Sequence, residues 1–389
     1  MSQASQLPKC PAKSLAIKHY FRTLRDPRRR HRRLHRLLDI VVIAICAVLC
    51  GADNWQEVAT FGQCRQAWLR RFLALPHGIP SHDTFERVFD RLDPQAFQAC
   101  FRSWISALCL HLQMPHIAID GKTLRHSGSG DLGPLHVVSA WATAQHLVLG
   151  QEVVAEKSNE ITAIPRLLEV LDLEGALVTI DAMGCQKDIA GQIVAQGGDY
   201  VLAVKENQPT LSADVQQVFD EVLSTDLTPL DYRSTQTTEC HHGRLEIRYY
   251  HVVSLPEDFA ERHPEWPGLR SLGLVLSERQ VGDQEPTYEA RFFISSLAPR
   301  VRRFAQAVRH HWGIENSLHW HMDITFGEDA SRIGRRHGAA NFALLRRLAL
   351  GLLKRHPEKK SIACKRFAAA LDTAFLEEIL QAAGNSEKA

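Results

Sequence analysis

Apolar residues recur at helical spacing in the first part of the chain. Leu34, Leu37 and Val41 lie three and four positions apart and lead into an uninterrupted apolar run at 40–50. No alternating strand pattern interrupts this part, so we predict an all-helical region over 1–110. The apolar run has 11 residues, too few to span a bilayer, so we expect a buried helix and no membrane partner.

A different pattern begins after this helical region. Short apolar runs bounded by turn residues are typical of buried strands, and they alternate with amphipathic stretches typical of helices. Strands are predicted at 117–119, 135–143, 147–154, 177–180 and 200–204, and helices at 161–171 and 187–196. The order strand-strand-strand-helix-strand-helix-strand predicts a mixed α/β layer around one sheet.

The last part of the chain is predicted to contain both strands and helices. The strands are expected at 231–255, 272–281 and 288–295, and the helices at 210–223, 301–322, 335–355 and 361–380. No glycine-rich phosphate loop accompanies any of these strands, so nucleotide binding is not indicated.

Charge is distributed unevenly along the 389 residues. The net charge is only +2, but residues 1–38 and residues 331–366 each contain 11 Lys or Arg and one acid, which leaves −18 for the remainder. Two basic segments around an acidic middle indicate nucleic acid as a partner, although a basic run can also be a solvated face.

The cysteines and the N-terminus bear on the cellular compartment. Nine cysteines occur without a CxxC pair or regular spacing, and no apolar signal segment is found at the N-terminus. A reducing compartment fits these cysteines, so we expect a cytoplasmic protein.

Three carboxylates stand out as candidate metal ligands. Asp120 and Asp181 each follow a predicted buried strand, and Glu315 lies on the predicted helix 301–322. Carboxylate oxygens suit Mg²⁺, and two such ions can activate an attacking oxygen and stabilise a leaving one. An aspartate after a strand can also be a simple turn former, so these residues alone leave both interpretations open.

Five motifs resemble the H-repeat-associated insertion-sequence transposases of the DDE superfamily. They are DGKTLRH from Asp120, EKSNEITAIP from Glu156, DAMGCQK from Asp181, GDYVLAVKENQ from Gly198 and HWGIENSLHW from His311. The motifs occur in the same order as in that family, and the similarity runs from about Arg25 to the C-terminal helix.

The resemblance implies a fold, a reaction and a set of partners. It implies an RNase H-like catalytic domain over 111–389, with a largely β insertion at about 208–298 before the last catalytic helix, and an N-terminal helical DNA-binding domain over 1–110. Asp120, Asp181 and Glu315 would be the catalytic triad and would bind two Mg²⁺ or Mn²⁺ ions. The substrate would be double-stranded DNA ending in the terminal inverted repeats of the element, cut and joined by a homodimer in a synaptic complex.

Two alternatives to an active transposase remain open. A decayed copy would be a DNA-binding protein without catalysis, and a metal-dependent nuclease would cut DNA without strand transfer. The carboxylates do not separate these functions, because hydrolysis and transesterification use the same metals.

Candidate DNA contacts are more scattered than the carboxylates. Related transposases carry a Tyr, an Arg and a Lys around the catalytic Glu, but Val308, His311 and Met322 occupy those places here. The DNA-binding candidates are Arg28, Arg29, Arg30, Arg32, Arg33, Lys122, Arg125, Lys205, His311, Trp312 and His319. The arginine run contains no aromatic residue, which suits phosphate contacts better than base recognition.

Overall fold

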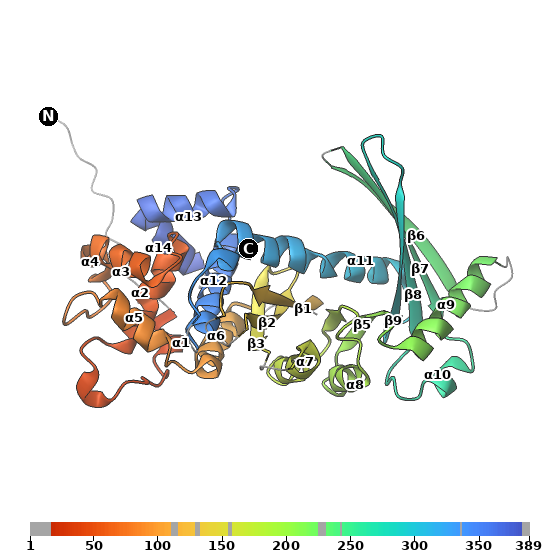
Figure 1. The fold of residues 1–389 in the computed structure, drawn as a ribbon, viewed down its shortest axis with the longest axis horizontal. Helices are drawn as coiled ribbons and strands as arrows, with labels where there is room; N and C mark the ends of the chain where they lie inside the picture. Colours follow the sequence, from red (N-terminus) through yellow and green to blue (C-terminus); the bar gives the residue numbers. More distant parts are fainter. Residues whose placement is uncertain are drawn as a thin grey trace. The chain divides into compact units, whose positions relative to one another are not determined.

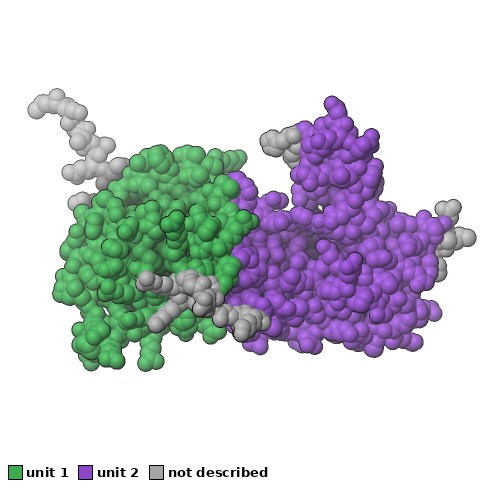
Figure 2. Space-filling view, viewed as in Figure 1, with its two compact units in different colours: residues 1–110, 124–135, 321–389 green, residues 111–123, 136–320 purple. Residues whose placement is uncertain are grey.

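The computed structural model describes residues 17–109, 116–128, 133–154, 158–224, 231–241, 243–334 and 337–382. The chain divides into two compact units, coloured separately in Figure 2. Unit 1 comprises residues 1–110, 124–135 and 321–389, and unit 2 comprises residues 111–123 and 136–320. The C-terminal segment thus shares a unit with the N-terminal helices. The sequence pattern does not predict this grouping.

Unit 1 is built from helices. They are α1 (Ile17–Phe21), α2 (Leu37–Leu49), α3 (Trp55–Cys64), α4 (Gln66–Leu69), α5 (His82–Phe89), α6 (Pro94–Cys109), α12 (Gly338–Arg355), α13 (Ile362–Leu371) and α14 (Thr373–Ala382). The apolar run after residue 40 forms α2, which is buried on nearly every side between α3 and α12. None of the described helices is both long and apolar enough to cross a membrane.

Part of the C-terminal basic segment lies inside unit 1. Arg346 and Arg347 on α12, and Lys365 and Arg366 on α13, are all buried. Arg347 forms a fully buried ion pair with Glu328, with 2.8 Å between Nη1 and Oε1. These four cations therefore belong to the core, and the expectation of a basic nucleic-acid surface made from them is wrong. The predicted helix at 361–380 is also two helices, interrupted at Asp372.

Unit 2 contains one nine-stranded mixed sheet (Figure 1). Its strands are β1 (His116–Leu124), β2 (Leu135–Ala142), β3 (Leu147–Val153), β4 (Leu177–Ile180), β5 (Asp199–Val204), β6 (Tyr232–His241), β7 (Arg244–Ser254), β8 (Ser271–Val281) and β9 (Thr287–Ser295). The spatial order is β3-β2-β1-β4-β5-β9-β8-β7-β6. Strands β1, β4 and β5 are parallel, whereas β9 pairs antiparallel with β5 and continues the sheet into the long ribbon of β6–β9. The mixed α/β class predicted from the sequence is confirmed.

Helices cover both faces of this sheet. On one face, α7 (Glu160–Leu168), α8 (Lys187–Ala195) and α9 (Pro209–Ser224) bury side chains such as Ile164, Ile189 and Phe219 against the strands. On the other face, α11 (Val301–His311) packs Phe304 and Val308 over β4, β5 and β7–β9. The helix α11 therefore lies across the sheet close to the parallel strand ends, which is where the candidate carboxylates occur.

Candidate active site

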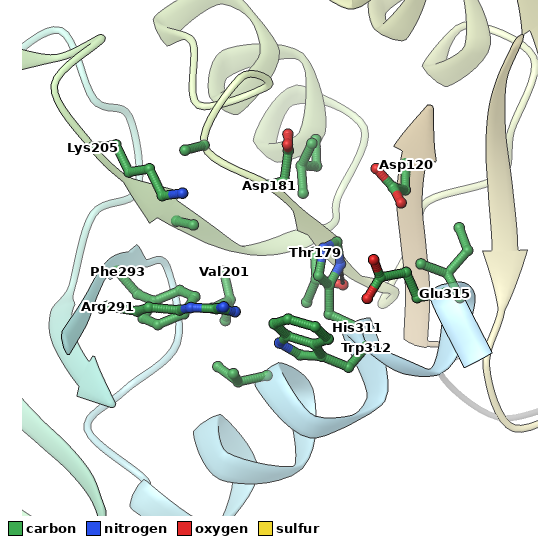
Figure 3. Close-up of a pocket in the computed structure, with 15 residues that line it drawn as sticks. Asp120, Thr179, Asp181, Val201, Lys205, Arg291, Phe293, His311, Trp312 and Glu315 are labelled. Carbon is green, nitrogen blue, oxygen red and sulfur yellow. Dashed lines mark hydrogen bonds between the residues drawn. The ribbon is translucent and has the colours of Figure 1, made fainter. Parts of the chain in front are cut away.

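The pairing of two parallel strands brings the first two carboxylates together. In the β1–β4 register, Ile119 pairs with Ile180 as the last paired position, and Asp120 and Asp181 each come next in the chain. Strand β1 continues to Leu124, so the sequence prediction that this strand ends at Asp120 is too short. Both aspartates nevertheless leave the β1–β4 ladder at the same level, side by side on adjacent strands (Figure 3).

A segment following α11 brings the third carboxylate to the same place. Asp120, Asp181 and Glu315 all line one pocket of about 340 Å³ (Figure 3). Its remaining wall is apolar and cationic and comprises Thr179, Ile180, Ala182, Val201, Ala203, Lys205, Arg291, Phe293, Val308, His311, Trp312 and Ile314. The pocket thus combines three carboxylates with two cations, all from unit 2.

The helix carrying Glu315 differs from the sequence prediction. A single α-helix over 301–322 was expected, but α11 ends at His311, and wider π-helical turns follow at Glu315–His319 and His321–Thr325. His311 and Glu315 nevertheless both line the pocket, and His319 lies close to the Asp120 carboxylate. π-Helical turns are rare and often mark functional sites, because the extra residue per turn redirects the side chains that follow.

Each aspartate is fixed by backbone hydrogen bonds. Asp120 Oδ1 accepts a hydrogen bond from the Gly121 amide at 2.9 Å, and its Oδ2 lies 3.5 Å from His319 Nδ1. Asp181 Oδ1 accepts from the amides of Met183 and Gly184, at 3.1 and 3.3 Å. These bonds orient the carboxylates without neutralising them with a Lys or Arg ion pair.

The crowding of acids perturbs both aspartates. Burial, followed by the charges of Asp181, Glu160 and Glu315, raises the pKa of Asp120 to about 7. Burial is also the main cause that raises the pKa of Asp181, with a contribution from Glu160 and opposing contributions from backbone amides and Lys205. Carboxylates that repel one another in a partly buried pocket would be relieved by a bound cation.

The donor set of this pocket fits a hard divalent ion. Oxygen-only ligands suit Mg²⁺ and Mn²⁺, which keep several waters or substrate oxygens in their coordination shell. Within the described residues, no three His, Cys, Asp or Glu side chains meet closely enough to form a ready-made metal cage. The pocket therefore offers separate carboxylate ligands around an open space.

His311 lies in the pocket wall as a neutral side chain. Its Nδ1 is 3.1 Å from Thr179 Oγ1, and the same hydroxyl is 2.9 Å from His116 Nε2. Burial lowers the pKa of His311 to about 4 and that of His116 to about 3. At neutral pH, His311 is uncharged and so does not supply a positive charge to a phosphate; it links the Glu315 segment to β4.

Trp312 and Arg291 form the cationic side of the pocket. The Arg291 guanidinium lies 4.4 Å from the centroid of the partly exposed Trp312 ring and also pairs with Glu289, with 2.7 Å between Nε and Oε1. The sequence analysis missed Arg291, which lies 24 residues before Glu315 on β9. No motif around Arg291 marks it as a site residue. Lys205, predicted from the sequence, follows β5, the strand that pairs with β9, and lines the same side of the pocket as Arg291 (Figure 3).

A second hollow adjoins the pocket along the β6–β9 ribbon. It has a volume of about 450 Å³ and shares Arg291, Val308, Trp312 and Glu315 with the pocket. Its arginines are Arg244, Arg248, Arg279, Arg291 and Arg309. Four of them pair with Glu239, Glu246 or Glu289, whereas Arg279 is exposed and forms no ion pair with any described residue.

The remaining predicted contact residues are not part of this pocket. Lys122 lies on β1 of unit 2, is buried, and is not among the pocket-lining residues. Arg125 belongs to unit 1, where its Nε lies 3.2 Å from Asp329 Oδ2. His319 is at the Asp120 carboxylate, as given above.

The arginine run of unit 1 separates into two groups. Arg28 is mostly buried and binds Asp26 and the His35 carbonyl, while Arg33 donates to the carbonyls of Arg28 and Asp26. These two side chains therefore stabilise the loop that carries them. Arg29, Arg30 and Arg32 are exposed, which leaves them available for phosphates.

Glu328 follows Glu315 by 13 residues and is another acid that could be considered as the third metal ligand. The structure argues against it. Its carboxylate is completely buried in unit 1 and paired with Arg347. A carboxylate whose charge is already satisfied in the core cannot serve an exchangeable metal without breaking that pair.

Comparison with known proteins shows the family of this chain. A family model described as "Transposase DDE domain" matches residues 111–352, and one described as "DDE_Tnp_1-associated" matches residues 18–105. The chain belongs to the DDE transposase family. Its family resemblance to H-repeat-associated transposases, inferred from the five motifs, is thereby confirmed.

Several relatives span nearly the whole chain. YhhI of Escherichia coli (strain K12), an H repeat-associated protein named as a transposase, is 39% identical over 90% of this chain and 94% of its own length. YncI of E. coli O157:H7, also named as a transposase, is 40% identical over 93% of both chains. Among solved structures, a piggyBac transposase synaptic complex aligns with a TM-score of 0.42 at 10% identity, over 100% of this chain and 85% of that one. That likeness is too weak to support a conclusion.

Proposed function

We propose that this transposase cuts and joins DNA phosphodiester bonds at the pocket lined by Asp120, Asp181 and Glu315. The observation that carries the proposal is the strand register, in which Ile119 pairs with Ile180 and the two aspartates follow at the same level. Glu315 lines the same pocket although it is 134 residues further along the chain than Asp181. Membership of the DDE family makes these three acids the natural candidates for the triad.

The proposed architecture is an RNase H-like core with an inserted ribbon. Strands β1–β5, with α7 after β3 and α8 after β4, have the element order expected of that core. The ribbon β6–β9 enters between β5 and α11, inside the insertion predicted at about 208–298. The helices over 17–109 would provide the separate DNA-binding region.

Asp120, Asp181 and Glu315 would hold two divalent ions, Mg²⁺ or Mn²⁺. When bound, such ions activate the attacking oxygen and stabilise the leaving oxygen of the phosphodiester. The protein's own contribution is to place oxygen donors at the ends of adjacent strands of a rigid sheet. The raised pKa of Asp120, about 7, supports the proposal, because a cation would favour the charged form.

Lys205 and Arg291 are the proposed phosphate contacts of the pocket. They approach from the adjacent strands β5 and β9, on the same side of the carboxylates, and Arg291 is oriented by Glu289 and Trp312. An arginine with its plane fixed by stacking can donate two parallel hydrogen bonds to a phosphate. Together they would take the place of the Arg and Lys that related transposases carry around the catalytic Glu.

The proposed substrate is double-stranded DNA ending in the terminal inverted repeats of the element. The arginine-bearing hollow along the ribbon would carry the DNA backbone toward the pocket, and Arg29, Arg30 and Arg32 would bind phosphates elsewhere. A homodimer holding two DNA ends in one synaptic complex would complete the reaction.

Substitution of each carboxylate by its amide tests the catalytic assignment. Asp120→Asn, Asp181→Asn and Glu315→Gln should each reduce Mn²⁺-dependent cutting by at least 100-fold, because each keeps the volume and removes a metal-binding charge. Cutting and joining are measured on a duplex carrying the inverted repeat, with a second DNA as acceptor of the 3′-OH end. Asp188→Asn, an exposed acid on α8, is the matched control and should cut normally.

The same assay separates the alternatives. Near-normal cutting by any one of the three amide variants would remove that residue from the triad. Cutting without joining, at all Mn²⁺ concentrations, would instead identify a nuclease that lacks strand transfer.

A further inference from the structure

Glu160 is a buried carboxylate beside the pocket that has no place in the proposed triad. It is the first residue of α7, and its side chain is only 12% exposed. Its Oε1 lies 2.7 Å from His136 Nε2, and His136 Nδ1 lies 2.8 Å from Thr123 Oγ1. Because an ionised carboxylate only accepts hydrogen bonds, Nε2 carries the proton and donates to Glu160, while Nδ1 accepts from the Thr123 hydroxyl.

Gly121 allows this close approach. The residue directly follows Asp120, and a β-carbon built on it would overlap both Glu160 Oε1 and His136 Nε2. The bare backbone at this position therefore lets the Glu160–His136 pair lie against β1, next to the first carboxylate of the pocket. Any larger residue would have to displace one of the two side chains.

The negative charge of Glu160 acts on both aspartates. Glu160 Oε1 lies against Gly121, the residue directly after Asp120, and its charge contributes to raising the pKa of Asp120 and of Asp181. Among the described residues, Glu160 pairs with no Lys or Arg, and its hydrogen-bond partner is His136. In the absence of a cation, the negative charge of Glu160 near two other carboxylates costs stability. A purely structural role at the start of α7 therefore does not explain its position.

We propose that Glu160, held in place by His136, is a positioning residue of the active-site pocket whose negative charge strengthens the binding of a divalent cation by Asp120 and Asp181. This inference rests on the proposed function. Glu160 supplies electrostatic potential to the pocket from its edge, and His136 prevents the carboxylate from turning away into solvent. The proposed site therefore has three acids that line the pocket as ligands, and a fourth beside it that acts through its charge.

The direct test is a measurement of Mn²⁺ affinity for full-length protein without DNA, by isothermal titration calorimetry. Glu160→Gln should raise the dissociation constant on the order of tenfold, as expected for the loss of one charge a few ångströms away. Glu169→Gln, an exposed acid at the end of the same helix, is the matched control and should bind Mn²⁺ as the wild type does. Raising the Mn²⁺ concentration should restore DNA cutting by Glu160→Gln but not by Asp120→Asn.

The role of His136 gives a second, independent variant. His136→Ala releases Glu160 and should weaken Mn²⁺ binding several-fold, whereas His136→Gln keeps a donor near the Nε2 position and should restore most of the affinity. If Glu160→Gln does not fold, as judged by circular dichroism, the two His136 variants decide the question by this difference.

Two results would overturn the inference. One is wild-type Mn²⁺ affinity in Glu160→Gln, or equal affinities in the two His136 variants, while Asp120→Asn has lost binding. The other is a Glu160→Gln protein that stays inactive at saturating Mn²⁺, since that would give Glu160 a part in the reaction itself. If Asp120→Asn also binds Mn²⁺ normally, the proposed metal site is at fault.

Discussion

Carboxylates in the two units have opposite electrostatic surroundings. In the helical unit, Glu328 meets Arg347 in a completely buried ion pair. In the sheet unit, Asp120 lies among Asp181, Glu160 and Glu315, and its pKa is raised to about 7 mainly by burial and by those acids. A carboxylate is thus paired with a cation in one unit and surrounded by other acids in the other.

The two kinds of carboxylate are expected to affect the stability of the fold differently. A paired buried acid stabilises the fold relative to the loss of either partner, because an unpaired buried charge is costly. A group of acids that repel one another destabilises the fold until a cation arrives. Removing one acid should therefore have opposite effects on the stability of the two units.

The largest expected effect is at the Glu328–Arg347 pair. Glu328→Gln or Arg347→Met should each lower the free energy of unfolding by about 3–5 kcal/mol, because each leaves one buried charge without its partner. Urea unfolding of the full chain, followed by tryptophan fluorescence, measures this loss. The double variant Glu328→Gln/Arg347→Met should recover part of the stability, and a double variant less stable than the sum of the single ones would contradict the assignment.

A smaller effect of opposite sign is expected at Asp120. Its pKa in the folded state, about 7, lies above the unfolded value near 3.8. Ionisation of Asp120 therefore costs nothing below about pH 4, lowers stability progressively as the pH rises from about 4 to 7, and has its full cost above about pH 7. In EDTA, Asp120→Asn should be more stable than the wild type by ~2 kcal/mol at pH 8, with no difference at pH 4.

Thermal unfolding at both pH values measures this difference. Asp188→Asn, with an exposed side chain, should show no gain in stability at either pH. A loss of stability in Asp120→Asn at pH 8 would mean that Asp120 is satisfied in the folded protein, as Glu328 is, and the contrast between the units would fail.

The smallest expected effect concerns the exposed arginines of the helical unit. Replacing Arg29, Arg30 and Arg32 by Ala should weaken DNA binding and reduce the slope of log affinity against log salt by up to roughly 3, because fewer counterions are released. Deleting residues 1–36 would be a poorer test, since it removes Phe21, which is buried in the core of the unit. Lys359→Ala, at another exposed cation, is the control.

Binding measured between low and moderate salt on inverted-repeat DNA decides this prediction. An unchanged slope in the triple variant, with a normal slope in Lys359→Ala, would show that the arginine run lies off the DNA. The folding of unit 1 should not change, because Arg28 and Arg33, which bind Asp26 and nearby carbonyls, are kept.

Sequence periodicity by itself determined much of the fold. The strand at 177–180 was predicted with the observed bounds, and β2, β3, β5, β8 and β9 differ by only one residue at an end. These elements are predictable because alternation, apolar runs and turn residues act within a few positions of one another. Asp120, Asp181 and Glu315 could be chosen as candidates for the same reason, since each belongs to a local motif.

Tertiary structure alone decided which of these residues meet. The β1–β4 register places Asp120 beside Asp181, the π-helical turns present Glu315 to the same pocket, and Arg291 arrives from a strand with no motif of its own. The basic run at 331–366 looked like a nucleic-acid surface, yet Arg347 and Arg366 are core residues. Charge composition carries no information about burial, because ion-pair partners are set by packing between segments far apart in the chain. For the same reason, the position of Glu160 beside the pocket becomes visible only in the folded protein, where α7 lies against Gly121.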